Sequence, residues 1–147
     1  AGVIEDIKEI EMAGTKRRYY SVRFAVGSMM TNIPIDSCES IGIRDVVDKG
    51  EAKKLLEYFR DVPVKDDSNW NRRQRENIEK IKSGNIYKVL DVLKDLMYRE
   101  RRVGLSTSER KTLGSARQIV LSELVLSNVA EISDIENILH DSIEVLV

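Results

Sequence analysis

Residues 68–75 decide how the rest of this chain is interpreted, and they read Ser68-Asn69-Trp70-Asn71-Arg72-Arg73-Gln74-Arg75. Trp70 is the only tryptophan of the protein, and three arginines follow it at once. The side chain of Ser68 or Asn69 can cap a helix, because its oxygen accepts a hydrogen bond from an amide of the first turn. The stretch therefore predicts a helix over 70–83 whose first turn carries Trp70.

Two interpretations of this stretch follow from the residues alone. At 100° per residue, Arg72 and Arg73 point away from each other, while Arg72 and Arg75 share a side. An exposed indole among guanidinium groups suits a nucleic-acid backbone beside an unstacked base step. Tryptophan side chains are usually mostly buried, however, so composition by itself favours Trp70 as a core anchor and the arginines as a solvated face.

The composition of the chain limits which classes of protein it can belong to. The chain has 147 residues, of which 41% are hydrophobic and 33% charged, and this predicts one or two compact domains. The net charge is -1, yet Lys and Arg gather in residues 72–82 and 99–111, and a local basic surface can bind phosphates. Cys38 is the only cysteine, which indicates a reducing compartment. No signal peptide or membrane span is recognisable, so we expect a cytoplasmic protein.

Strand patterns fill the first third of the chain. Gly14 and Gly27 are expected in turns, and Pro34 limits its strand to a sheet edge. Such closely spaced short strands indicate a small twisted barrel, which buries little apolar surface and needs a further strand or a partner. The chain starts at Ala1 without a methionine, so we expect a preceding segment to be left out. The predicted strands cover residues 3–10, 18–25, 29–35 and 42–47.

The hydrophobic period becomes helical from Asp48 onward. Five helices are predicted, which start at Asp48, at Trp70, at Asn85, at one of Ser106, Thr107 and Ser108, and at Ile132; Glu109 can complete a capping box to Ser106. The fold class is therefore α+β, with a β domain at 1–47 and an all-α domain at 48–147. The expected inward residues are Ala52, Leu55, Leu56, Phe59, Ile78, Ile81, Ile86, Val89, Leu90, Leu93, Leu96, Met97, Leu113, Ala116, Ile119, Val120, Leu124, Leu126, Ile135, Ile138, Leu139, Ile143 and Leu146.

Patterns that carry catalysis or metal binding are missing from the sequence. His140 is the only histidine and lies on an acidic final helix, and Cys38 has no partner base. We find no Cys/His cluster, no phosphate-binding glycine loop and no nucleophile elbow. We therefore expect no catalytic residue, no metal, no cofactor and no small-molecule substrate. A β module beside a helical module suggests an adaptor that holds one macromolecule while it contacts another.

A series of short motifs runs through both predicted domains: Gly2–Ile7, Tyr19–Val22, Asn32–Ile35, Gly42–Val47, Asn69–Arg73, Glu79–Gly84, Lys88–Leu90, Val92–Leu96, Gly104–Ser106 and Ala116–Ile119. Each motif is weak by itself, and it is their order over nearly the whole chain that is specific. In this order they resemble the CarD family of bacterial transcription regulators.

For the β domain, the resemblance implies a Tudor-like module of the kind shared with transcription-repair coupling factors, which binds the β subunit of RNA polymerase. The matching surface comprises Ile10, Met12, Thr31 and Asn32. Well-known members carry arginines where this chain has Ile10 and Asn32. The family's first strand, with its Tyr-Pro and His-Gly signature, is absent here, so we expect the barrel to be incomplete.

For the helical domain, the resemblance implies contact with promoter DNA at the upstream edge of the transcription bubble. Trp70 occupies the position of a tryptophan that wedges into the minor groove there, and Arg72, Arg73 and Arg75 match basic backbone contacts. The resemblance therefore favours an exposed Trp70. It also implies a protein that associates with the bacterial nucleoid. A wedge at a step that melting has already unstacked avoids much of the cost of unstacking.

Two functions from different classes remain after the sequence analysis. The first is a non-enzymatic regulator that binds RNA polymerase and stabilises the open promoter complex. Its DNA binding is expected to be weak, salt-sensitive and independent of sequence, because arginines on phosphates read no base. The second is a protein-binding scaffold without DNA contact, in which Trp70 is a core residue and a free β edge mediates assembly.

Overall fold

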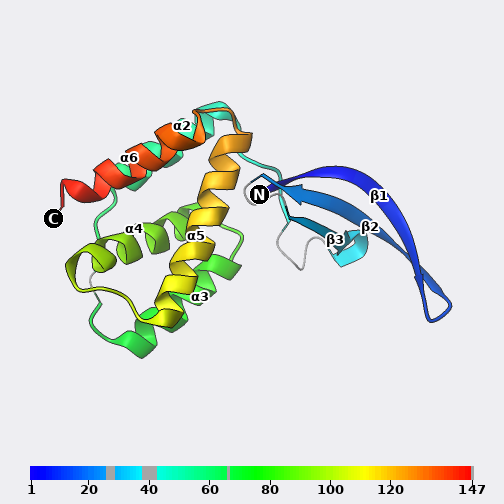
Figure 1. The fold of residues 1–147 in the computed structure, drawn as a ribbon, viewed down its shortest axis with the longest axis horizontal. Coiled ribbons are helices and arrows are strands. Elements are labelled where there is room, and N and C mark those ends of the chain that lie inside the picture. Colours follow the sequence, from blue (N-terminus) through cyan, green and yellow to red (C-terminus); the bar gives the residue numbers. More distant parts are fainter. Residues whose placement is uncertain (26–28, 38–42, 66, 147) are drawn as a thin grey trace.

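The computed structural model describes residues 1–25, 29–37, 43–65 and 67–146. In this part of the chain a small antiparallel sheet precedes five α-helices, which confirms the predicted α+β class (Figure 1). The elements are β1 (Gly2–Met12), β2 (Thr15–Phe24), β3 (Met30–Pro34), the short 3₁₀ helix η1 (Ile35–Ser37), α2 (Lys49–Asp61), α3 (Trp70–Lys82), α4 (Ile86–Arg102), α5 (Thr107–Leu126) and α6 (Ile132–Glu144).

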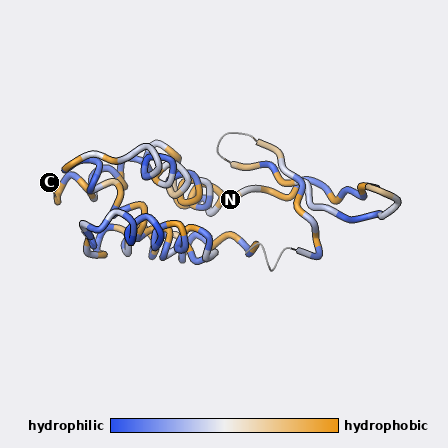
Figure 2. The backbone as a smooth tube through the Cα atoms, turned by 90° about the horizontal axis from the view of Figure 1, so that it is seen from below, coloured by the Kyte–Doolittle hydropathy of each residue, from blue (hydrophilic) through white to orange (hydrophobic). Residues whose placement is uncertain are grey.

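Strands β1 and β2 form a long hairpin that extends away from the helices (Figures 1 and 2). Its turn consists of Ala13 and Gly14, with φ values of 51° and 78°. Two successive positive φ angles define the type I′ turn, whose twist matches that of the flanking strands. Strand β3 pairs only with residues 19–23 of β2, so the end of the hairpin projects beyond it.

The sheet is open. Its strand order is β1-β2-β3, and β1 and β3 are its two edges among the described residues. The prediction that Pro34 ends an edge strand is confirmed. The prediction of a strand at 42–47 is wrong for residues 43–47, because this segment binds the helices instead. Gly42, the turn at Gly27 and the side chain of Cys38 lie outside the described residues.

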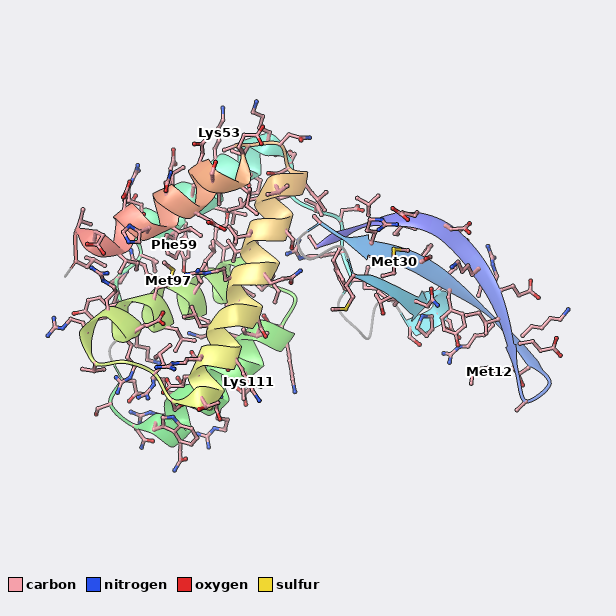
Figure 3. The ribbon with its side chains drawn as sticks, viewed as in Figure 1. Met12, Met30, Lys53, Phe59, Met97 and Lys111 are labelled. Atoms are coloured by element: carbon pink, nitrogen blue, oxygen red, sulfur yellow. The ribbon has the colours of Figure 1, made fainter. Side chains whose placement is uncertain are left out.

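Helix α4 is at the centre of the helical part and contacts α2, α3, α5 and α6. Its apolar residues are buried on several sides, and Figure 3 marks Met97 from α4 and Phe59 from α2 inside this core. The predicted apolar stripes of α2, α4 and α5 are confirmed. The buried hydrophobic residues of the helical part are Ala52, Leu55, Phe59, Ile86, Val89, Leu90, Val92, Leu93, Leu96, Met97, Leu113, Ala116, Val120, Leu121, Leu124, Ile135, Leu139 and Ile143.

Three predicted inward residues are wrong. Ile78 of α3 is exposed, because the inner side of this helix carries Arg73 and Asn77, with Ile81 one turn further on. Ile138 and Leu146 are also exposed, because α6 buries only the narrower stripe Ile135, Leu139 and Ile143 and ends at Glu144.

Arg44 connects residues 43–47, the segment that follows the sheet, to the helical part. Its Nε donates a hydrogen bond of 2.7 Å to the carbonyl oxygen of Gly84, and its Nη2 lies 2.6 Å from Oε1 of the buried Glu123. Val47 packs against the helical core. Between the sheet and the helices lies a cleft of about 570 Å³, with Tyr20 among the sheet residues that line it. Residues 43–47 therefore belong with the helices.

Candidate nucleic-acid interface

Trp70 lies on the first turn of α3 and is 43% exposed. The side chain of Asn69 accepts a 3.1 Å hydrogen bond from the amide of Arg72, which confirms the predicted helix cap. Because the helix begins at Trp70 itself, no preceding turn covers the indole. The interpretation of Trp70 as a core anchor is therefore wrong.

The indole of Trp70 contacts the start of a second helix. Its Nε1 donates a hydrogen bond of 3.3 Å to Oγ of Ser106, the N-cap residue of α5. The same Oγ accepts a 3.2 Å hydrogen bond from the amide of Glu109, so the predicted capping box is present. Figure 3 shows this end of α5, marked by Lys111, beside α3. The first turns of α3 and α5 thus meet at Trp70.

The three arginines after Trp70 differ in their surroundings. Arg72 is exposed, and its Nε and Nη2 donate hydrogen bonds of 2.8 and 2.9 Å to the carboxylate of Asp67. These bonds, together with one from the amide of Asn69, hold the pKa of Asp67 well below its ordinary value. Arg75 is exposed on the same side and makes no ion pair within the described ranges. Of these three arginines, Arg75 is therefore the most available to an anion.

Arg73 is buried. Its Nε and Nη2 donate hydrogen bonds of 2.9 and 3.0 Å to the carboxylate of Glu109, and its Nη1 donates one of 2.8 Å to the carbonyl oxygen of Asp67. Burial alone would raise the pKa of Glu109, but the hydrogen bonds and charge of Arg73, together with the charge of Arg99 and the backbone of Ser106, outweigh burial and lower this pKa. Arg73 thus joins α3 to α5 instead of facing solvent with Arg72.

Two residues of α4 hold the loop that leads from α2 to Trp70. The buried ammonium of Lys94 donates hydrogen bonds of 2.9 and 2.6 Å to the carbonyl oxygens of Arg60 and Val62. The last carbonyl groups of a helix have no hydrogen-bond partner within the helix. Lys94 therefore supplies the hydrogen bonds that the two carbonyls at the end of α2 would otherwise lack. Further on, the amide of Lys65 donates a 2.9 Å hydrogen bond to Asp95. Helix α4 therefore holds the first part of this loop, from the end of α2 to Lys65.

The four residues expected to face RNA polymerase do not form one cluster. Ile10 and Met12 lie in the part of the hairpin beyond β3, where Ile10 pairs with Arg17. Thr31 and Asn32 lie on β3, at the opposite edge of the sheet. Figure 3 marks Met12 at the far end of the hairpin, where it is 68% exposed. The structure thus separates the predicted surface into a hairpin part and an edge part.

Sequence reasoning missed three members of this site: Asp67, Ser106 as a partner of Trp70, and Glu109 as a partner of Arg73. The capping box located Ser106 and Glu109 at a helix start, yet it does not say which other helix meets them. No local signal could have found them, because only the contact between α3 and α5 brings Arg73 to Glu109, 36 residues further along the chain.

Two further findings concern the chemistry of the described residues. Within residues 1–25, 29–37, 43–65 and 67–146, no group of three His, Cys, Asp or Glu side chains is arranged to hold a metal ion. His140 is exposed on α6, within 3.5 Å of Glu144. None of the helices described has the length and apolar character needed to cross a membrane.

A small sheet with open edges, joined to a helical domain with an exposed tryptophan beside arginines, is typical of an interaction protein. Residues 54–140 match the family model described as the C-terminal domain of CarD. The chain is also 33% identical over 132 residues to the putative transcription factor YdeB of Bacillus subtilis (strain 168), an alignment that covers 89% of this chain and 86% of the relative. The chain belongs to the CarD family, and it is a transcription regulator.

Proposed function

We propose that this regulator stabilises the open promoter complex by binding promoter DNA at the upstream edge of the bubble and RNA polymerase through its β subunit. The observation that carries the proposal is the exposed position of Trp70 on the first turn of α3, beside Arg72 and Arg75. It agrees with membership of a family of transcription regulators.

The way in which Trp70 can act as a wedge follows from the shape of its ring and from the charged residues beside it on α3. An apolar ring inserted at a base step that melting has already unstacked avoids much of the cost of opening that step. While the ring occupies the step, the two strands re-pair more slowly. Arg75, and Arg72 after release from Asp67, can bind the adjacent phosphates. Such contacts read no base, so binding is weak and independent of sequence.

Polymerase binding is assigned to the sheet. Both edges of the sheet are open among the described residues, and an open edge can pair with a strand of a partner. Thr31 and Asn32 are at one of these edges, and Ile10 and Met12 supply an apolar surface on the projecting hairpin. The sheet would tether the protein, while the helical domain contacts DNA.

The test is the lifetime of the open complex formed by the cognate RNA polymerase on a ribosomal-type promoter. The wild type is expected to prolong this lifetime, and Trp70→Ala to lose most of the gain, because truncation removes the wedge. Ile78→Ala is the matched control, since Ile78 is a similarly exposed apolar residue on the same helix, at 38% against 43% for Trp70.

Each variant is first checked for folding by circular dichroism. A folded Trp70→Ala protein that prolongs the lifetime as much as the wild type would contradict the wedge and move the function to the sheet. Equal losses in Trp70→Ala and Ile78→Ala would point to a general effect of the α3 surface.

A further inference from the structure

An exposed indole is normally free to turn about its side-chain torsions, but the polar end of Trp70 is held. Its Nε1 donates to Oγ of Ser106 at 3.3 Å, across 36 residues of sequence. Nε1 is the only hydrogen-bond donor of an indole, so this single contact defines which edge of the ring faces α5 and which faces outward.

The acceptor oxygen is itself fixed in place. Oγ of Ser106 accepts from the amide of Glu109 at 3.2 Å, and its hydroxyl donates toward Oε1 of Glu109 at 3.4 Å. A hydroxyl has one donor and two acceptor positions, and with the contact to Trp70 all three are used. Ser106 therefore cannot rotate its hydroxyl without losing an interaction.

Glu109 is held in turn by the helix that carries the indole. Its carboxylate receives two hydrogen bonds from Arg73, at 2.9 and 3.0 Å, and both side chains are buried. Arg73 is three residues after Trp70, on the neighbouring turn of α3. The interactions form a closed ring that runs from Trp70 through Ser106, Glu109 and Arg73 back to the start of α3.

We propose that Ser106 is a positioning residue that fixes the orientation of the Trp70 indole in the free protein, with the Arg73–Glu109 pair as its rigid support. The part of this inference that concerns DNA rests on the proposed function. Ordering a side chain on binding weakens an interaction by about two- to tenfold, and a ring that is oriented beforehand avoids this loss. Ser106 thus makes the wedge more effective without contacting DNA.

The first experiment uses the free protein, in which Trp70 is the only tryptophan and its fluorescence reports this residue alone. Time-resolved anisotropy measures the fast local rotation of the indole. Ser106→Ala removes the acceptor, so the amplitude of the fast component is expected to rise clearly. Ser106→Thr keeps the oxygen and is expected to restore the wild-type decay.

Ser106→Ala also removes a helix cap, and this effect needs its own control. Asp48 is the N-cap of α2, where its side chain accepts a 2.8 Å hydrogen bond from the amide of Glu51. Asp48→Ala therefore removes a comparable cap from another helix, and it is expected to leave the anisotropy of Trp70 unchanged. Unchanged anisotropy in Ser106→Ala, or an equal increase in Asp48→Ala, would overturn the proposal.

The second experiment is a double-mutant cycle on open-complex lifetime. Ser106→Ala is expected to reduce the gain in lifetime by about two- to tenfold in the wild-type background. Trp70→Phe keeps an aromatic ring but has no Nε1, so in this background Ser106→Ala is expected to have no further effect. If the losses caused by Ser106→Ala and Trp70→Phe are additive, Ser106 does not act through the indole. If Trp70→Ala leaves the lifetime unchanged, the proposed function fails, while the anisotropy result still decides the role of Ser106.

Discussion

At the scale of single residues, Asp95 combines burial with a structural hydrogen bond. Burial raises its pKa to about 6, although the bond from the Lys65 amide and the charge of Lys80 act in the opposite direction, and the nearby Asp91 adds to the increase. The carboxylate is the acceptor that holds the loop before Trp70, at 2.9 Å from the amide of Lys65. At neutral pH the protein therefore keeps a partly buried charge in order to fix this loop.

Replacing Asp95 by asparagine is expected to stabilise the protein at high pH. The side-chain oxygen of the introduced asparagine can still accept from the Lys65 amide, while the buried charge is gone. Because the pKa of Asp95 is higher in the folded state, at about 6, than its ordinary value of 3.8, wild-type stability from this group falls as the pH rises through that interval. Asp95→Asn should therefore gain about 1–3 kcal/mol at pH 8 and nothing at pH 4 or below.

Urea denaturation of both proteins at pH 8 and pH 4 measures this difference. An equal gain at the two pH values would show that the charge of Asp95 is not the cause. A loss at pH 8 would mean that the ionised carboxylate contributes more to the loop than its burial costs.

At the scale of elements, α3 is a helix whose inner side is partly polar. Arg73 and Asn77 are buried there, and Arg73 is matched by Glu109 of α5. The hydrophobic period alone pointed to Ile78 and Ile81, of which only Ile81 packs against the core. A buried ion pair is thus what sets the rotation of α3, and with it the outward direction of Trp70.

Breaking this ion pair on one side is expected to be more damaging than removing both partners. Glu109→Gln leaves the guanidinium of Arg73 buried beside a neutral group, and should cost about 3–5 kcal/mol of unfolding free energy. The double variant Arg73→Met with Glu109→Met has no buried charge and should regain most of the loss. Chemical denaturation of the three proteins gives these values, and a double variant as unstable as Glu109→Gln would contradict the argument.

Elements with a local signal could be predicted from the sequence. The caps at Asn69 and Ser106 and the stripes of α2 and α4 depend on neighbouring residues, and all were found. Which face of α3 turns inward depends on Glu109, 36 residues away, and no periodicity contains that information. The same limit applies to residues 43–47, which were predicted to form a short strand although Arg44 binds the helices.

At the scale of the whole molecule, residues 43–47, which lead from the sheet into the helices, are held by polar contacts of Arg44 beside a cleft. Arg44 reaches both the carbonyl oxygen of Gly84 and the carboxylate of Glu123, whose side chain is only 4% exposed. The attachment of residues 43–47 to the helices therefore depends strongly on Arg44.

Arg44→Ala is expected to loosen this junction while the helical core stays folded. The variant leaves Glu123 without its cation, and residues 43–47 lose two of their contacts to the helices. Cleavage within this segment by elastase in limited proteolysis should become about tenfold faster, which corresponds to about 1.4 kcal/mol of local opening free energy. Mass spectrometry of the fragments measures the cleavage, with sites in α4 as the internal control. Unchanged cleavage in the segment, or equal acceleration in α4, would contradict a local role.

The pairing of Arg72 with Asp67 has a consequence for how selective the surface is. The carboxylate of Asp67 occupies the place where an external phosphate would meet the guanidinium, so the protein carries its own competitor for Arg72. A phosphate that approaches the Nε and Nη2 edge of the guanidinium must displace this internal anion, and a lone backbone segment gains little by doing so. Binding to ordinary duplex DNA is thereby weakened. A DNA site that also accommodates the ring of Trp70 is therefore preferred over the large excess of other DNA in a cell.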